Sequence, residues 1–285
     1  LLLADSWGKR PYRRFADALL RDAVYHALPF AFKRKAHLAL AKLLDIDAEK
    51  NPKLWPVLAQ HYEQGGDDAK SRANHRLAGR DAFSRFDNVT ALRHLEYVCK
   101  TITADHEDVE DAFNLLDIYG FLGQREGAER ILPPLALNQE KMAPQQQARF
   151  CYFQARAKGQ EQDWEASERM LQKGLALYEK AGDIVGMGKS YVNLVGLIYG
   201  PMGRLEEAKV ALNKALALQK GPNQAVFRTL ASMNLGVVHK HEGNADKAER
   251  AFGTAYRQSA RARLGPQRGM VSGNLAALFY DSGRF

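Results

Sequence analysis

The sequence predicts an all-helical protein built from helix hairpins that stack on one another. Helix-forming residues dominate the 285-residue chain and only 10 prolines interrupt it, so local propensity favours helix nearly everywhere. The second half also repeats itself, because Gly203-Arg204-Leu205-Glu206-Glu207-Ala208 returns as Gly243-Asn244-Ala245-Asp246-Lys247-Ala248, 40 residues later (243 − 203). A single hairpin cannot cover its own apolar face, so a regular repeat of this length indicates that neighbouring hairpins cover it.

Residues 1–48 differ from this pattern. Leu1-Leu2-Leu3 and the segment from Tyr12 to Phe15 predict two short strands around a turn at Gly8. Apolar residues then recur at helical spacing, and Pro29 separates two predicted helices. The second of these helices has an apolar stripe, which consists of Phe32, Ala36, Leu40 and Leu43. Its basic residues at 33–35 form a solvent-exposed face.

Residues 52–140 predict degenerate helical repeats, and residues 141–285 predict regular ones. In the regular part, one unit resembles the tetratricopeptide repeat (TPR) pattern of Leu-Gly, Tyr, Ala, Phe and Ala. The matching residues are Leu235-Gly236, His239, Ala248, Phe252 and Ala255. The resemblance implies a right-handed α–α superhelix of TPR-like hairpins. Gly283-Arg284-Phe285 begins a further copy, so we expect the natural protein to continue beyond this fragment.

Two stretches are similar to a more specific family, the STAND-type signalling ATPases, which include soluble-type class III adenylyl cyclases and large ATP-dependent transcription activators. The segment 12–29, with its Arg21-Asp22 and Tyr25-His26-Ala27-Leu28, resembles the end of that family's winged-helix segment. The segment Leu58-Ala59-Gln60-His61-Tyr62, continuing to Asp67, resembles the start of its repeat arm. The family's frequent His after Phe is Asp17 here. The resemblance implies a parent protein with an upstream ATPase or cyclase module.

No motif in the sequence predicts catalysis, and we expect the fragment to be non-enzymatic, without cofactor or metal. The segment 183–190 approaches a phosphate-binding loop, but Asp183 replaces its first glycine and the preceding residues have a helical pattern. His239 and His241 are two residues apart and so face different sides of a helix, unlike metal-chelating histidines. The two cysteines, Cys99 and Cys151, are far apart and fit a reduced, cytoplasmic protein. No apolar run reaches the length of a membrane span.

The net charge of +8 is moderate and leaves a nucleic-acid-binding repeat, or a nucleotide-binding domain, as alternatives. If the chain bound nucleic acid, a basic tract near its end would form the binding surface. It lacks interleaved aromatic residues beyond Tyr256, so a hydrated outer face is the simpler interpretation. The tract consists of Arg250, Arg257, Arg261, Arg263 and Arg268.

Three asparagines are the candidate binding residues. Asn193, Asn234 and Asn274 precede equivalent core positions, with separations of 41 (234 − 193) and 40 (274 − 234). The first helix of each TPR lines the groove, where an Asn can bond both the N–H and the C=O of an extended peptide. The alternative is that these amides bridge neighbouring helices. Lys240, beside the groove, would favour an acidic ligand. The sequence therefore predicts a scaffold that binds a protein or peptide segment, and the parent's own ATPase module is one candidate for that segment.

Overall fold

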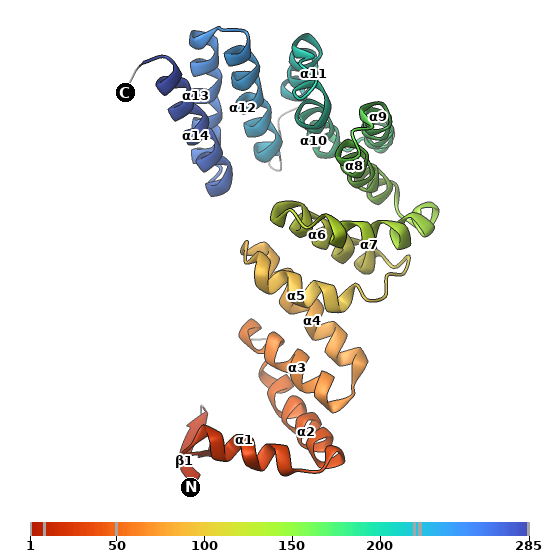
Figure 1. The fold of residues 1–285 in the computed structure, drawn as a ribbon, viewed down its shortest axis with the longest axis vertical. Helices are drawn as coiled ribbons and strands as arrows, with labels where there is room; N and C mark the ends of the chain where they lie inside the picture. The colour runs from red at the N-terminus through yellow and green to blue at the C-terminus, as the bar shows by residue number, and fades with distance from the viewer. Residues whose placement is uncertain (1, 8–9, 49–50, 219–220, 222–223, 284–285) are drawn as a thin grey trace. The chain divides into compact units, whose positions relative to one another are not determined.

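In the computed structural model, the protein consists of helices with one pair of strands at the start (Figure 1). The structure describes residues 2–7, 10–48, 51–218, 221 and 224–283. The predicted turn residue Gly8 and the repeat residues Arg284 and Phe285 lie outside the described residues. None of the described helices is long and apolar enough to cross a bilayer.

Contacts divide the chain into two compact units. The first comprises residues 1–101 and 117–123, and the second comprises residues 102–116 and 124–285. The predicted boundaries near residues 50 and 140 separate stretches of different repeat regularity, whereas these units are defined by packing contacts. Helix α6 (His106–Leu122) contributes residues to both units.

The first unit begins with strands β1 (Leu2–Trp7) and β2 (Arg10–Phe15), which pair antiparallel from Leu2↔Phe15 to Trp7↔Arg10. Packing contacts then run in chain order from α2 to α5. Helix α1 has no buried residue, and the core starts at α2 with Ala41 and Leu44 against Leu58 of α3. The helices of this unit are α1 (Ala18–Ala27), α2 (Phe30–Ala48), the 3-10 turn η1 (Pro52–Leu54), α3 (Trp55–Gly65), α4 (Asp68–Ser84) and α5 (Asn88–Val98).

The segment that resembles the start of a STAND repeat arm serves packing and capping. Gly66 ends α3 with φ 72°, and the Asp67 carboxylate accepts the N–H of Lys70 at the start of α4. Arg34 of the basic face donates to the carbonyls of Gly65 and Gly66, at 2.8 and 3.3 Å. A cationic side chain on the last carbonyls of a helix is favourable, so this contact ties α2 to the end of α3.

In the second unit, paired helices follow one another along the chain (Figure 1). Gly203 and Gly243 both have positive φ, 68° and 74°, and each lies in the turn between two helices of a hairpin. The helices are α7 (Arg125–Leu137), the 3-10 turn η2 (Gln139–Lys141), α8 (Pro144–Gln160), α9 (Trp164–Ala181), α10 (Ile184–Leu194) with the π-helical turn η3 (Val195–Tyr199), α11 (Leu205–Ala217), α12 (Ala225–His241), α13 (Ala245–Arg261) and α14 (Gly265–Asp281).

Small residues allow these helices to cross closely. A Cβ added to Gly236 of α12 would lie 2.6 Å from the Phe252 ring of α13. Two hairpins earlier, Ser167 Oγ of α9 donates to the carbonyl oxygen of Ala155 of α8 at 2.8 Å. Large residues fill the space beside these crossings, with Leu212 and Phe252 fully buried at equivalent positions. The repeated core residues predicted from sequence are therefore the residues that join the helices.

Candidate functional site

The candidate site lies on the first helices of the hairpins in the second unit. We call α8, α10 with η3, α12 and α14 the A helices, and α9, α11 and α13 the B helices. Each A helix contacts the next A helix, as α8 does α10, α10 does α12, and α12 does α14. Phe227 of α12 packs against Gly188 of α10, where an added Cβ would lie 2.6 Å from the ring. The A helices therefore form a layer of directly stacked neighbours.

The three candidate asparagines occupy equivalent places in this layer. On each A helix, the residue four before and the residue three after the Asn share its face. We call this set the A-helix face, which consists of Lys189, Asn193 and Gly196; Leu230, Asn234 and Val237; and Met270, Asn274 and Ala277. All three asparagines are half-buried, and none of their side chains forms a hydrogen bond within the described part of the chain. Among the described residues, these amides therefore form no hydrogen-bonded bridge to a neighbouring helix.

The unequal separations of the asparagines have a structural cause. Between α10 and Gly200 the backbone adopts a π-helical turn, in which the Gly200 N–H donates to the Val195 carbonyl at 2.8 Å. An i→i+5 bond accommodates one extra residue compared with an α-helix. Asn193 precedes this turn and lies 41 residues before Asn234, whereas Gly203 follows it and lies 40 residues before Gly243. The extra residue of this repeat is therefore contained in η3.

A cleft opens beside the π-helical turn. Its volume is about 620 Å³, and we call it the π-turn cleft. Gly196 and Gly200 contribute no side chain to it, and a Cβ on Gly196 would meet nothing within 4 Å. Asn234 and His241 are the polar side chains of the lining. The remaining lining residues are Val195, Pro201, Gly203, Leu205, Val237 and Val238. This cleft was not predicted from the sequence, although the change in the asparagine separation from 41 to 40 residues was a signal for it.

Lys240 differs from its predicted role. It follows Asn234 by six residues and therefore lies off the A-helix face. Its ammonium forms an ion pair with the carboxylate of Asp281 at 2.7 Å. The cation on the A-helix face is instead Lys189, which is exposed and forms no ion pair with any described residue.

The charges of the hairpins are unevenly divided between the two helix types. In the A helices the only acidic residue is Asp281, at the end of α14, whereas the B helices carry seven acidic residues. The cations of the A helices are Arg149, Arg156, Lys158, Lys189, Arg228, Lys240 and Arg268. Three of them are paired, Arg149 with Glu110, Lys158 with Glu161 and Lys240 with Asp281. The A-helix layer is thus net basic.

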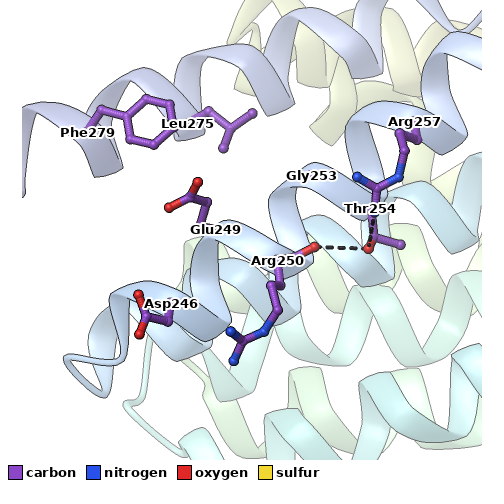
Figure 2. Close-up of a pocket in the computed structure, with 8 residues that line it drawn as sticks. All are labelled: Asp246, Glu249, Arg250, Gly253, Thr254, Arg257, Leu275 and Phe279. Carbon is purple, nitrogen blue, oxygen red and sulfur yellow. Dashed lines mark hydrogen bonds between the residues drawn. The ribbon is translucent and has the colours of Figure 1, made fainter. Parts of the chain in front are cut away.

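A second cleft, shown in Figure 2, lies between α13 and α14. Arg250 and Arg257 of the predicted basic tract line it, but Asp246 and Glu249 lie beside them. Thr254 Oγ1 donates to the Arg250 carbonyl at 2.9 Å and accepts from Arg257 at 3.2 Å. Acidic and basic side chains alternate here, which does not suit a polyanion backbone.

The segment that approaches a phosphate-binding loop forms the start of α10. The Asp183 carboxylate accepts the Gly186 N–H, so Asp183 caps the helix. A Cβ on Gly186 would lie 2.2 Å from the Tyr178 ring, and Gly188 packs against Phe227. The element before it is helix α9 and not a strand. These glycines therefore permit close helix packing. Separately, no group of three or more potential metal ligands occurs among the described residues.

A tetratricopeptide repeat family model matches residues 189–221. This stretch covers most of the A helix α10 with η3, the turn at Gly203 and the B helix α11. Within a chain of stacked helix hairpins, residues 189–221 therefore match a tetratricopeptide repeat.

Several solved structures resemble the chain, whereas no curated protein matches it. One is MamA, at 22% identity, with 64% of this chain and 95% of that chain covered and a TM-score of 0.41. BtubC from P. vanneervenii is 19% identical over 83% of this chain and 93% of its own, with a TM-score of 0.46. A Rap protein complexed with Competence and Sporulation Factor is 9% identical over 91% and 78%, with a TM-score of 0.46.

Proposed function

We propose that the chain is a non-catalytic interaction arm that binds an extended protein or peptide segment along the A-helix face. The observation that carries this proposal is the repeated, unbonded asparagine at 193, 234 and 274. These half-buried amides form no hydrogen bond with any described residue, and an extended backbone offers each of them both a donor and an acceptor. Equivalent spacing on stacked helices suits a ligand that runs across them.

The test uses peptides selected from a random dodecapeptide library displayed on phage. Binding of the best peptide is measured by fluorescence anisotropy with the intact chain and with Asn234→Ala. Loss of one or two hydrogen bonds should weaken binding about 3- to 10-fold. Asn213→Ala is the matched control, because Asn213 is exposed on the B helix α11. A library that yields no binder, or equal affinity of Asn234→Ala and the intact chain, would contradict the assignment.

We propose further that the arm belongs to a larger cytoplasmic signalling protein, in which it regulates an upstream ATPase or cyclase module. The resemblance of segments 12–29 and 58–67 to STAND-type proteins supports this, and β1, β2, α1 and α2 would then be a winged-helix remnant. The hairpins would continue as a right-handed superhelix. The gene sequence on both sides of this chain is the test. An upstream nucleotide-binding module is expected, and a gene without one would refute this part of the proposal.

A nucleic-acid-binding repeat remains the second candidate, and the net charge of +8 favours it. Binding to a single-stranded oligonucleotide would then fall steeply as salt increases. The mixed charges beside Arg250 and Arg257 make us expect no such binding at physiological salt.

A further inference from the structure

We infer that the π-turn cleft receives one aliphatic side chain of an acidic peptide segment whose carboxylates meet the cations of the A helices. This inference rests on the proposed function and adds the chemistry of the partner. It joins two independent observations, which are the shape of the cleft and the distribution of charge in the second unit.

The cleft has the properties of an anchor site for an aliphatic group. Apart from Asn234 and His241 its walls are apolar, formed by Val195, Leu205, Val237 and Val238. Gly196 in the π-helical turn and Gly200 just after it contribute no side chain to the cleft. Burying an aliphatic side chain in such a space contributes roughly 1.5–3 kcal/mol relative to leaving it in water. Asn234 lies in the lining, so its amide can bond the backbone of the residue whose side chain enters.

The charge of the A helices selects an acidic partner. A basic peptide would face Lys189 and the other cations of this layer, with only Asp281, which already pairs with Lys240, to attract it. Three cations of this layer form ion pairs and Arg228 donates to the carbonyls of Leu216 and Leu218, so an acidic peptide would meet its complementary charge at Arg156, Lys189 and Arg268. Complementary charge increases both association rate and specificity. Lys189 is the nearest such cation to an asparagine on its own helix, one turn before Asn193.

Two substitutions test the two halves of the inference separately. Gly196→Leu adds an aliphatic side chain to the lining of the cleft, at a position where the Cβ meets nothing within 4 Å. Its control is Gly269→Leu on α14, which is equally unobstructed but lies outside the cleft. Lys189→Glu reverses the charge on the A-helix face, and its control is Lys247→Glu, an exposed lysine of the B helix α13.

The experiment selects binders from the dodecapeptide library with the intact chain and measures their affinity for each variant. We expect enriched peptides with one Leu, Ile, Val or Met flanked by Asp or Glu. Gly196→Leu and Lys189→Glu should each weaken binding about 10-fold or more, whereas the controls stay within about twofold. Thermal melting checks that all four variants are folded.

The possible outcomes separate the inference from the proposed function. Peptides that bind through Asn234 but lack acidic enrichment, or whose affinity survives Lys189→Glu, would overturn the acidic partner and leave the interaction arm intact. Unchanged affinity with Gly196→Leu would overturn the anchor site. A library without any binder would refute both the inference and the proposed function.

Discussion

Gly236 of α12 lies against the ring of Phe252 of α13, with space for a hydrogen but not for a methyl group. An added Cβ would lie 2.6 Å from both Cδ1 and Cε1 of that ring, and Phe252 is fully buried. Gly236→Ala should therefore destabilise the second unit by roughly 1–3 kcal/mol, because the ring or the helix must move. Chemical denaturation measures this. Gly269→Ala, where the Cβ meets nothing, should instead stabilise by about 0.5–1 kcal/mol.

Phe252 itself holds the two helices of this hairpin together. It belongs to a core cluster with Met233, Ala248 and Val271. Phe252→Ala should leave a cavity and reduce the free energy of unfolding by about 3–5 kcal/mol. Tyr280→Ala provides the comparison, because Tyr280 is 72% exposed and should cost much less. Similar losses for the two variants in urea denaturation would contradict the predicted packing.

The first unit should lose stability in mild acid because of a buried histidine pair. His75 and His94 approach to 2.8 Å between their Nδ1 atoms. Burial lowers the pKa of each histidine to about 4. The charges of Arg93 and Lys100 lower the pKa of His75 further. His75 and Arg93 have the same effect on the pKa of His94. As the pH falls, the unfolded chain binds these protons near pH ~6.5, before the folded chain does. The stabilisation is therefore present above pH ~6.5 and is lost as the pH falls towards about 4.

The size of this acid effect is measurable by urea denaturation at two pH values. Each histidine should contribute roughly 1–2 kcal/mol of lost stability between about pH 7 and about pH 5. The double variant His75→Gln/His94→Gln removes the titrating groups and should flatten the dependence. If the intact chain and the double variant respond equally to pH, the pair does not cause the acid sensitivity.

The segment 183–190 should bind no nucleotide, because aromatic rings pack against Gly186 and Gly188. Millimolar Mg-ATP should leave the Tm of the chain unchanged, since a ligand raises stability only by binding the folded state. Gly186→Ala should lower the Tm, because its Cβ would meet the Tyr178 ring at 2.2 Å. An ATP-dependent increase in Tm would show that a nucleotide site exists in the chain.

The fold was largely predictable from the sequence because repetition reveals packing. Gly236, Phe252 and Ala255 could be identified as joining residues since their counterparts recur 40 residues away, and the tetratricopeptide match at 189–221 confirms the repeat type. The π-turn cleft was not predicted. Its signal was a single additional residue, and one insertion can be accommodated in a loop, a longer helix or a π-helical turn with no sequence difference between them.

The ion pair of Lys240 also could not be predicted from the periodicity of the sequence. Its charge is compensated by Asp281, a residue 41 positions later on another helix. A contact between two helices depends on how the helices stack, which a pattern within one helix does not determine. The uneven charge of A and B helices, by contrast, is visible in the sequence once the helices are delimited.

The central claim is that the A-helix face binds a peptide through its repeated asparagines. Heteronuclear NMR of the ¹⁵N-labelled chain with a library-selected peptide tests it most directly, with the side-chain amides of Asn193, Asn234 and Asn274 as reporters and Asn213 as the internal control. We predict that peptide addition shifts the resonances of the three reporters and leaves that of Asn213 in place. Unshifted reporters in the presence of saturating peptide would contradict the claim.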